Sequence, residues 1–185
     1  MTIITDFNEA MKLERSRRQP SLEFLPFSVS TLLDGIKSSL FPDVTQSVNV
    51  YFVTRGPLAC IVFSDTSATI YIHQLLNNTD TPKEVVTFII KHELLHLRIP
   101  PRTVKGKEVD HPPEFWEAER SIAPERQYAW RWIWANFMTC IKRRPRLERI
   151  DVLPSWRRAW SGHRPQLEVY QQLLGIGDDE ENGWL

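Results

Sequence analysis

The sequence predicts an α+β fold in which a small, mostly antiparallel sheet packs on one buried helix and further helices follow. Three observations support this fold class. Three segments rich in Val, Ile, Tyr and Phe lie between positions 48 and 73, with turn residues between them. An apolar stretch from Val85 to Leu97 follows, and its composition is typical of a buried helix. Beyond it, aromatic residues recur at helical spacing.

Helical segments are expected before the sheet. The stretch up to Arg18 is compatible with a helix and ends in a basic cluster. Ser28 or Ser30 can cap a short helix that runs towards Leu40, because a serine side chain accepts a hydrogen bond from a free backbone N–H group of the first turn. The sheet is therefore expected to follow a capped helix.

The strand candidates are residues 48–54, 58–64 and 68–73. The intervening segments 55–57 and 65–67 contain Gly, Pro, Asp and Ser, which are common in turns. Short turns join antiparallel neighbours, so we expect a largely antiparallel sheet. An exposed sheet edge can bind an extended peptide as an additional strand, and residues 68–73 are the candidate for that edge.

The helix after the sheet contains two histidines four residues apart, with a glutamate directly after the first. These residues are His92, Glu93 and His96. Positions i and i+4 lie on the same helical face, so the two imidazoles can converge on one cation. The spacing therefore predicts two ligands of a metal site.

The context of this motif is that of a buried helix. Thr81 as N-cap, Pro82 at the first helical position and Glu84 in a capping box would start it. In the alternative interpretation, the two histidines are core residues hydrogen-bonded to the backbone and the glutamate is a surface charge. Burying three polar groups without partners is costly, so a metal site is the favoured interpretation.

Glu93 stands where its carboxylate can reach a metal-bound water rather than the metal. Zinc lowers the pKa of bound water towards about 7, and a nearby carboxylate can take the proton as the water attacks a polarised carbonyl. Catalytic zinc sites use three protein ligands and leave one position for water. The motif thus predicts Glu93 as the general base of a hydrolytic site that needs a third ligand.

The third ligand can come from the segment after the helix. His111 precedes the prolines that would open the next helix, and residues 98–110 are long enough to reverse the chain. A glutamate on the downstream helix is the alternative, and Glu114, Glu117 and Glu119 lie where it could come from. His111 is the preferred candidate.

The other two histidines are not expected to bind the metal. His73 should lie on or just beyond a strand in a partly exposed position, and His163 should lie at the surface. No pair of side chains marks the group that would stabilise an oxyanion. His73, Tyr71 and Tyr128 are the candidates for that role.

The motif and its flanking residues resemble the SprT-like and YgjP-like zinc metallopeptidases. Members of that family have HExxH, a short variable loop and then a histidine followed closely by phenylalanine, as in residues 111–116 of this chain. The similarity extends from about Thr66 to Glu119. It implies a zincin-like domain, a protein or peptide substrate, one zinc ion held by His92, His96 and His111, and Glu93 as the catalytic base.

Helices are expected to make up much of the remaining chain. One spans about residues 113–122, and a longer one, opened by Pro124, runs to about Arg143. Shorter helical pieces are expected near residues 154–160 and 166–174. These helices would pack around the sheet and the motif helix.

The C-terminal third of the chain is basic and aromatic. Ten Lys and Arg residues and two acids lie between Arg126 and Arg164, interleaved with five tryptophans. Cations beside stackable rings suit a nucleic-acid surface, and DNA is a candidate partner. The alternative is a core-facing aromatic stripe of an ordinary helix. The residues that would contact nucleic acid are Arg143, Arg144, Arg146, Arg157, Arg158 and Trp156.

The bulk properties set the boundaries of this interpretation. A chain of 185 residues can bury one good core, so we predict a single domain over residues 1–177 and a frayed acidic tail over residues 178–185. Cys60 and Cys140 are expected to be reduced, buried thiols. The sequence contains no long apolar run and no secretory signal, which predicts a cytoplasmic protein that does not enter a membrane.

An alternative function belongs to another class. Several SprT-like proteins carry a zinc ribbon with four cysteines, and this chain has only two cysteines. It could instead be a non-catalytic nucleic-acid or protein-binding module with a structural or vestigial zinc site. A fourth protein ligand would favour that alternative, because structural zinc sites are closed to water.

Overall fold

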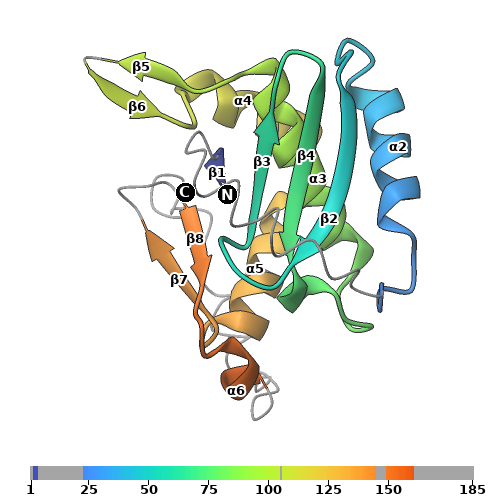
Figure 1. The fold of residues 1–185 in the computed structure, drawn as a ribbon, viewed down its shortest axis with the longest axis vertical. Helices are drawn as coiled ribbons and strands as arrows, with labels where there is room; N and C mark the ends of the chain where they lie inside the picture. Colours follow the sequence, from blue (N-terminus) through green and yellow to red (C-terminus); the bar gives the residue numbers. More distant parts are fainter. Residues whose placement is uncertain (1, 4–22, 105, 145–148, 161–185) are drawn as a thin grey trace.

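The central sheet of the computed structural model has four strands in the order β1-β3-β4-β2 (Figure 1). Strands β3 and β4 pair antiparallel, whereas β1 pairs with β3, and β2 with β4, in parallel. The three longer strands lie where the sequence predicts them, but the sheet is mixed rather than mostly antiparallel. The strand bounds are Thr2–Ile3 (β1), Ser47–Val53 (β2), Ala59–Phe63 (β3) and Ser67–His73 (β4).

Strand β4 is central because it is apolar on both faces. Ile70, Tyr71 and Ile72 are all buried, whereas the first half of β2 is exposed or half-buried. β4 therefore inserts between β2 and β3, so that β2 and β4 run in the same direction. The prediction of residues 68–73 as an exposed edge is wrong for the same reason. β2 forms one edge of the sheet, and β1 pairs along the outer side of β3.

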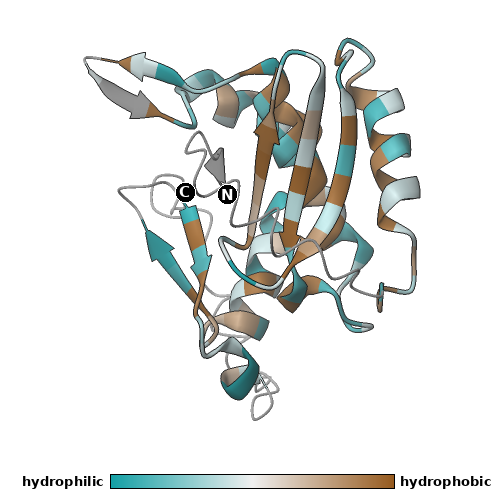
Figure 2. Ribbon diagram, in the orientation of Figure 1, coloured by the Kyte–Doolittle hydropathy of each residue, from teal (hydrophilic) through white to brown (hydrophobic). Residues whose placement is uncertain are grey.

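The two faces of the sheet contribute to two clusters of apolar side chains. Alternate residues of a strand point to opposite faces, and the larger cluster takes one set from each strand. The smaller cluster on the opposite face contains Val53, Cys60 and Tyr71. Figure 2 shows the apolar residues concentrated on these strands and on the helix behind them. The strand side chains in the larger cluster are Val48, Val50, Phe52, Ala59, Ile61, Phe63, Ala68, Ile70 and Ile72.

The structure describes residues 2–3, 23–104, 106–144 and 149–160. Within these ranges, no helix has both the length and the hydropathy needed to cross a membrane. Cys60 and Cys140 are buried thiols, as the sequence predicts. Several predictions lie outside the described residues: the helix up to Arg18, the helical piece at residues 166–174, the tail at residues 178–185, and the positions of His163 and Arg146.

A helix and a 3-10 turn precede the helix that carries the histidine motif. α2 (Val29–Leu40) has Ser28 as its N-cap, as predicted, and η1 (Gln74–Leu76) follows the sheet. α3 (Lys83–Arg98) carries the histidine motif. Its predicted capping by Thr81 is wrong. Pro82 is itself the N-cap residue with extended backbone, and the Thr81 hydroxyl is buried without a hydrogen-bond partner.

The helices after the site are α4 (Pro113–Ile122), α5 (Arg126–Phe137) and α6 (Trp156–Trp160). α5 is shorter than predicted. Residues Ile141–Arg144 form β7, which pairs antiparallel with β8 (Arg149–Val152). The backbone N–H of Leu58 also donates to the carbonyl of Ile150 at 2.8 Å. These long-range partners favour the extended backbone over a continued helix.

A hairpin not predicted from the sequence lies between α3 and α4. Its strands are β5 (Arg102–Val104) and β6 (Lys107–Val109), which pair antiparallel. Gly106 has a φ of 77°, a conformation that glycine adopts without the steric cost of a side chain. In Figure 1 this hairpin and β7–β8 lie on the side of the sheet away from α2. The hairpin reverses the chain between the two parts of the histidine cluster.

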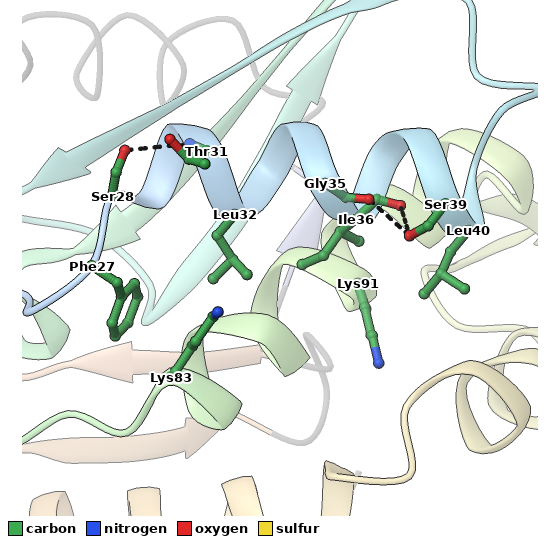
Figure 3. Close-up of a pocket in the computed structure, with 10 residues that line it drawn as sticks. All are labelled: Phe27, Ser28, Thr31, Leu32, Gly35, Ile36, Ser39, Leu40, Lys83 and Lys91. Carbon is green, nitrogen blue, oxygen red and sulfur yellow. Dashed lines mark hydrogen bonds between the residues drawn. The ribbon is translucent and has the colours of Figure 1, made fainter.

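A groove of about 540 Å³ lies beside α2 and α3 (Figure 3). Phe27, Leu32 and Leu40 supply apolar lining, and Lys83 and Lys91 supply the two cations. None of the motif histidines lines this groove. It is therefore separate from the candidate metal centre.

Candidate metal centre

The C-terminal half of α3 supplies His92, Glu93 and His96. This helix packs against α2, α4, α5 and β3, so almost all of its side chains from Val85 to His96 are buried. His92, Glu93 and His96 are each 0% exposed. Both imidazoles lie within one helical turn of each other, with ring centroids 5.0 Å apart. The local geometry expected from the spacing is present.

His111 joins these two histidines from the other side of the hairpin. It lies directly before Pro112, the N-cap residue of α4, and is 4% exposed. Its Nε2 atom is 3.1 Å from Nε2 of His92. One ligand atom from each of His92, His96 and His111 lies within 4.8 Å of the others. The structure thus brings together the three histidines that the sequence singles out.

The three glutamates considered as alternative ligands take other positions. Glu114 and Glu117 are exposed, and Glu114 forms an ion pair with Arg102 at 2.6 Å. Glu119 is fully buried, but it contacts Nδ1 of His92. Nδ1 is on the opposite side of the ring from Nε2. Glu119 therefore supports a histidine of the cluster and is not one of its grouped ligand atoms.

Glu119 is held between two partners. Oε1 accepts the hydrogen bond from His92 Nδ1, and Oε2 accepts one from Arg126 Nε at 2.6 Å. Burial raises the pKa of this carboxyl, but the contacts with His92 and Arg126 outweigh it and hold the pKa below its ordinary value. A charged carboxylate on Nδ1–H leaves the lone pair of His92 on Nε2, facing His111.

Aromatic rings enclose the histidines. The ring centroid of Phe115 lies 4.9 Å from that of His92, 4.6 Å from that of His96 and 4.8 Å from that of His111. Trp116 stacks on His111 with centroids 4.7 Å apart. The first turn of α4 thus restricts the orientation of all three imidazoles.

Several polar atoms of the cluster have no hydrogen-bond partner among the residues that the structure describes. They are both ring nitrogens of His96 and both carboxylate oxygens of Glu93. Buried polar atoms without partners are costly, so a bound ligand is the natural explanation. Convergent imidazole nitrogens with adjacent orphaned atoms fit a bound divalent cation.

Burial sets the protonation states in the metal-free site. It lowers the pKa of His92 to about 3 and lowers that of His96 well below its ordinary value. Both imidazoles are therefore neutral at pH 7, which is the form that binds metals. Burial also raises the pKa of Glu93 to about 8. A nearby cation would lower that pKa, because it favours the charged carboxylate.

The candidate oxyanion donors do not gather at this cluster. Tyr71 belongs to the smaller apolar cluster on the opposite face of the sheet, and Tyr128 on α5 is 41% exposed. His73 is 1% exposed, so the expectation of a partly exposed position is wrong. Its Nδ1 accepts a hydrogen bond from Leu75 N at 3.0 Å, which caps η1.

The candidate nucleic-acid residues lie on β7 and α6, next to the sheet. Arg144 and Arg149 both pair with Asp151, at 3.0 and 2.8 Å. Trp156 is half-buried and makes an edge-to-face contact with His73, while the Arg157 guanidinium lies 4.9 Å from the centroid of its ring. The aromatic residue chosen for base stacking therefore already has protein neighbours. Arg157 and Arg158 are exposed.

Sequence reasoning missed the roles of Phe115, Glu119 and Arg126. Helical spacing offered a signal, since Phe115 and Glu119 are four residues apart and share one face of α4. A buried acid on the face that touches the histidines is a candidate partner for an imidazole N–H. The pairing with Arg126 depends on the turn between α4 and α5, which local sequence does not specify.

Comparisons with known proteins add no family assignment. A scan against protein-family models finds no match, and a search of curated proteins finds no similar sequence.

Proposed function

We propose that this protein is a zinc-dependent metallopeptidase that hydrolyses peptide bonds through an activated water. One observation carries the proposal: three buried histidines converge beside Glu93, whose carboxylate oxygens have no hydrogen-bond partner among the described residues. A histidine used only for packing would have its ring nitrogens hydrogen-bonded. Here the atoms without a hydrogen-bond partner belong to His96 and Glu93, a histidine and a glutamate of the kind that hydrolytic zinc sites use.

His92, His96 and His111 would hold the ion, and one ligand atom from each lies in the same small volume. Zinc with three protein ligands makes water a nucleophile near neutral pH and polarises a substrate carbonyl. Three histidines, with no fourth ligand grouped with them in the part of the chain that the structure describes, suit that use. The SprT-like resemblance of residues 66–119 agrees with this ligand set.

Glu93 would act as the general base and then as the proton donor. Its carboxylate takes a proton from the attacking water at one oxygen and returns it to the amine of the leaving fragment. Within the described residues, no side chain donates a hydrogen bond to this carboxylate. No such donor therefore lowers its basicity.

A peptide or protein is the proposed substrate, with an extended segment bound along a sheet edge. The outer side of β3 is the edge next to α3, and β1 pairs there with Cys60 and Ile61. β2 forms the opposite edge. A substrate strand beside β3 would therefore lie next to β1 or replace it.

The test is the substitution Glu93→Gln, assayed with casein and a mixed peptide library. The variant should keep one zinc per chain and lose hydrolysis by about 10²–10⁴-fold, because the base is absent while the histidines remain. Glu114→Gln, the same change at an exposed position of α4, is the matched control and should retain activity. Full activity of Glu93→Gln would refute the mechanism.

A closed zinc site in a non-catalytic binding module is the second candidate. The complete burial of His92, Glu93 and His96 favours it, because a catalytic centre must admit water and substrate. Cobalt substitution separates the two. A hydroxamate that binds an open coordination position should change the visible spectrum of the cobalt protein, whereas a closed site should leave the spectrum unchanged.

DNA remains a proposed partner of the basic residues on β7 and α6. Phosphate contacts make binding depend on salt, so DNA affinity should fall steeply as ionic strength rises. The combined change Arg157→Gln and Arg158→Gln should weaken DNA binding and leave casein cleavage without DNA unaltered. DNA affinity that is the same in this variant would exclude α6 as the contact surface.

A further inference from the structure

Glu119 occupies a position in which it can determine how one histidine binds a metal. It is 0% exposed and comes from α4, whereas its contact His92 comes from α3. Its two oxygens are divided between two donors, His92 Nδ1 and Arg126 Nε. A neutral imidazole has one N–H donor and one acceptor nitrogen. The proton of His92 is therefore fixed on Nδ1 by an acceptor that cannot donate.

We propose that Glu119 is a positioning residue that, together with Arg126, fixes His92 in the tautomer that presents Nε2 to the metal. The alternative tautomer would place a proton on Nε2 and block coordination. An imidazole ligand commonly donates its other N–H to a carboxylate, which sets the ring orientation and raises its basicity. Here the carboxylate also needs Arg126, because it is buried and would otherwise lack a cationic partner.

The turn between α4 and α5 holds this arrangement against α3. Lys91 precedes His92, and its Nζ atom donates to the carbonyl of Ile122 at 2.8 Å and pairs with Glu125 at 2.8 Å. Glu125 in turn precedes Arg126. The pair Lys91–His92 of α3 thus faces the pair Glu125–Arg126. The first residues of the two pairs form an ion pair with each other, and the second residues, His92 and Arg126, both contact Glu119. The register of the ion pairs places the carboxylate at the imidazole.

A glutamine at position 119 can serve only one of the two donors. Its side-chain oxygen can accept from His92 or from Arg126, and its NH₂ group must then face the other donor. If the oxygen turns to Arg126, the NH₂ group faces Nδ1 of His92 and selects the wrong tautomer. Removal of Arg126 frees the oxygen for His92. The two substitutions should therefore interact strongly.

The experiment measures the zinc affinity of four proteins by competition with a chromophoric chelator: wild type, Glu119→Gln, Arg126→Met and the double variant. Glu119→Gln should bind zinc about 10–100-fold more weakly than wild type. Arg126→Met should also weaken binding in the wild-type background. In the Glu119→Gln background, the same Arg126→Met change should instead strengthen binding. This reversal of sign is the expected result.

Matched controls separate positioning from a general loss of stability. Glu114→Gln makes the same change at an exposed site of α4 and should leave zinc affinity within about twofold of the wild-type value. Lys91→Met removes the neighbouring ion pair with Glu125. Lys91→Met should lower the unfolding midpoint of the metal-free protein. Circular dichroism identifies any variant that fails to fold, and Glu119→Asp, which keeps the charge, then replaces Glu119→Gln. Glu119→Asp should bind zinc more tightly than Glu119→Ala.

Two results would overturn the proposal: unchanged zinc affinity in folded Glu119→Gln, or an Arg126→Met effect of the same sign in both backgrounds. The proposal rests on the metal centre of the proposed function, but its readout is binding rather than hydrolysis. Wild type that binds zinc and cleaves nothing would contradict only the peptidase. Wild type that binds no zinc would contradict both.

Discussion

Two sets of buried histidines in this protein have opposite surroundings. His73, at the end of β4, has an acceptor nitrogen that caps η1, a hydrogen bond to the backbone of Thr54 and an edge-to-face contact with Trp156. His96, on α3, has no hydrogen-bond partner at either ring nitrogen among the described residues. Both are almost completely buried.

The difference separates a structural histidine from a ligand. Protein partners satisfy His73, so nothing further is required to explain its burial. The described residues supply no such partner to His96, which is the result expected of a metal ligand. His73 and His96 are the same type of residue and are equally buried, so the hydrogen bonds of their ring nitrogens are what distinguishes them.

The largest expected effect is on zinc affinity. Zinc sites in small domains bind with about 10–16 kcal/mol, so loss of one histidine ligand should cost on the order of 3 kcal/mol, or ~100-fold in affinity. His96→Ala should show this loss, and His73→Ala should bind zinc like wild type in the same chelator competition. Equal losses of zinc affinity in His96→Ala and His73→Ala would contradict the distinction between a metal ligand and a structural histidine.

Acidification should destabilise the metal-free protein through these histidines. Burial lowers the pKa of His73 to about 4, whereas the unfolded value is 6.5. Between these values the unfolded chain binds a proton that the folded chain excludes, so stability is lost as the pH falls through this window. Between pH 7 and pH 5, His73→Gln should lose about 2 kcal/mol less than wild type, measured by urea unfolding with a chelator present. Parallel curves would contradict this assignment.

Glu93 should have the opposite pH dependence in the metal-free protein. Burial raises its pKa to about 8, so the folded state retains a proton that the unfolded state releases. Stability should therefore decrease as the pH rises from about 4.5 to 8. Between pH 4.5 and pH 6, Glu93→Gln should lose about 2 kcal/mol less stability than wild type. Chemical denaturation with a chelator present measures the difference, and a constant offset would exclude this origin.

Leucine substitutions compare the two histidines without metal. His73→Leu leaves the buried N–H of Leu75 without an acceptor and should cost about 1–3 kcal/mol. His96→Leu removes polar atoms that have no partner, so the metal-free protein should be equally or more stable. Urea midpoints of the chelator-treated variants test this. A large loss in His96→Leu would indicate that the protein itself satisfies this ring.

The smallest effect is expected from Trp156→Phe. The edge-to-face contact with His73 should be weakened but not lost, at a cost of about 1 kcal/mol or less. Zinc affinity should remain unchanged, because the ring of Trp156 contacts His73 and Arg157, neither of which belongs to the histidine cluster. A change in zinc affinity would show that the two regions are coupled.

Much of the candidate site could be predicted because its spacing is local. His92 and His96 are one turn apart on a helix, and the prolines after His111 begin the next helix, so both placements follow from short-range rules. The role of Glu119 could not be predicted in this way. It depends on how α4 crosses α3, which the packing of many side chains decides.

The incorrect predictions about the fold also arise because contacts between distant segments cannot be read from local sequence. Residues 141–144 continue a helical pattern, yet they form β7 because β8 supplies a long-range partner. The strands were located correctly, but their order was not, because alternation of apolar residues specifies a strand and not its neighbours.

The sequence by itself determined the three longer strands, the buried helix and the three histidines that could bind a metal, because periodicity and spacing act over a few residues. Only the tertiary structure decided that β4 is central, that His73 is satisfied by the protein, and that Glu119 and Arg126 stand behind His92. These features require contacts between distant segments, whose pairing is decided by the burial of the whole core.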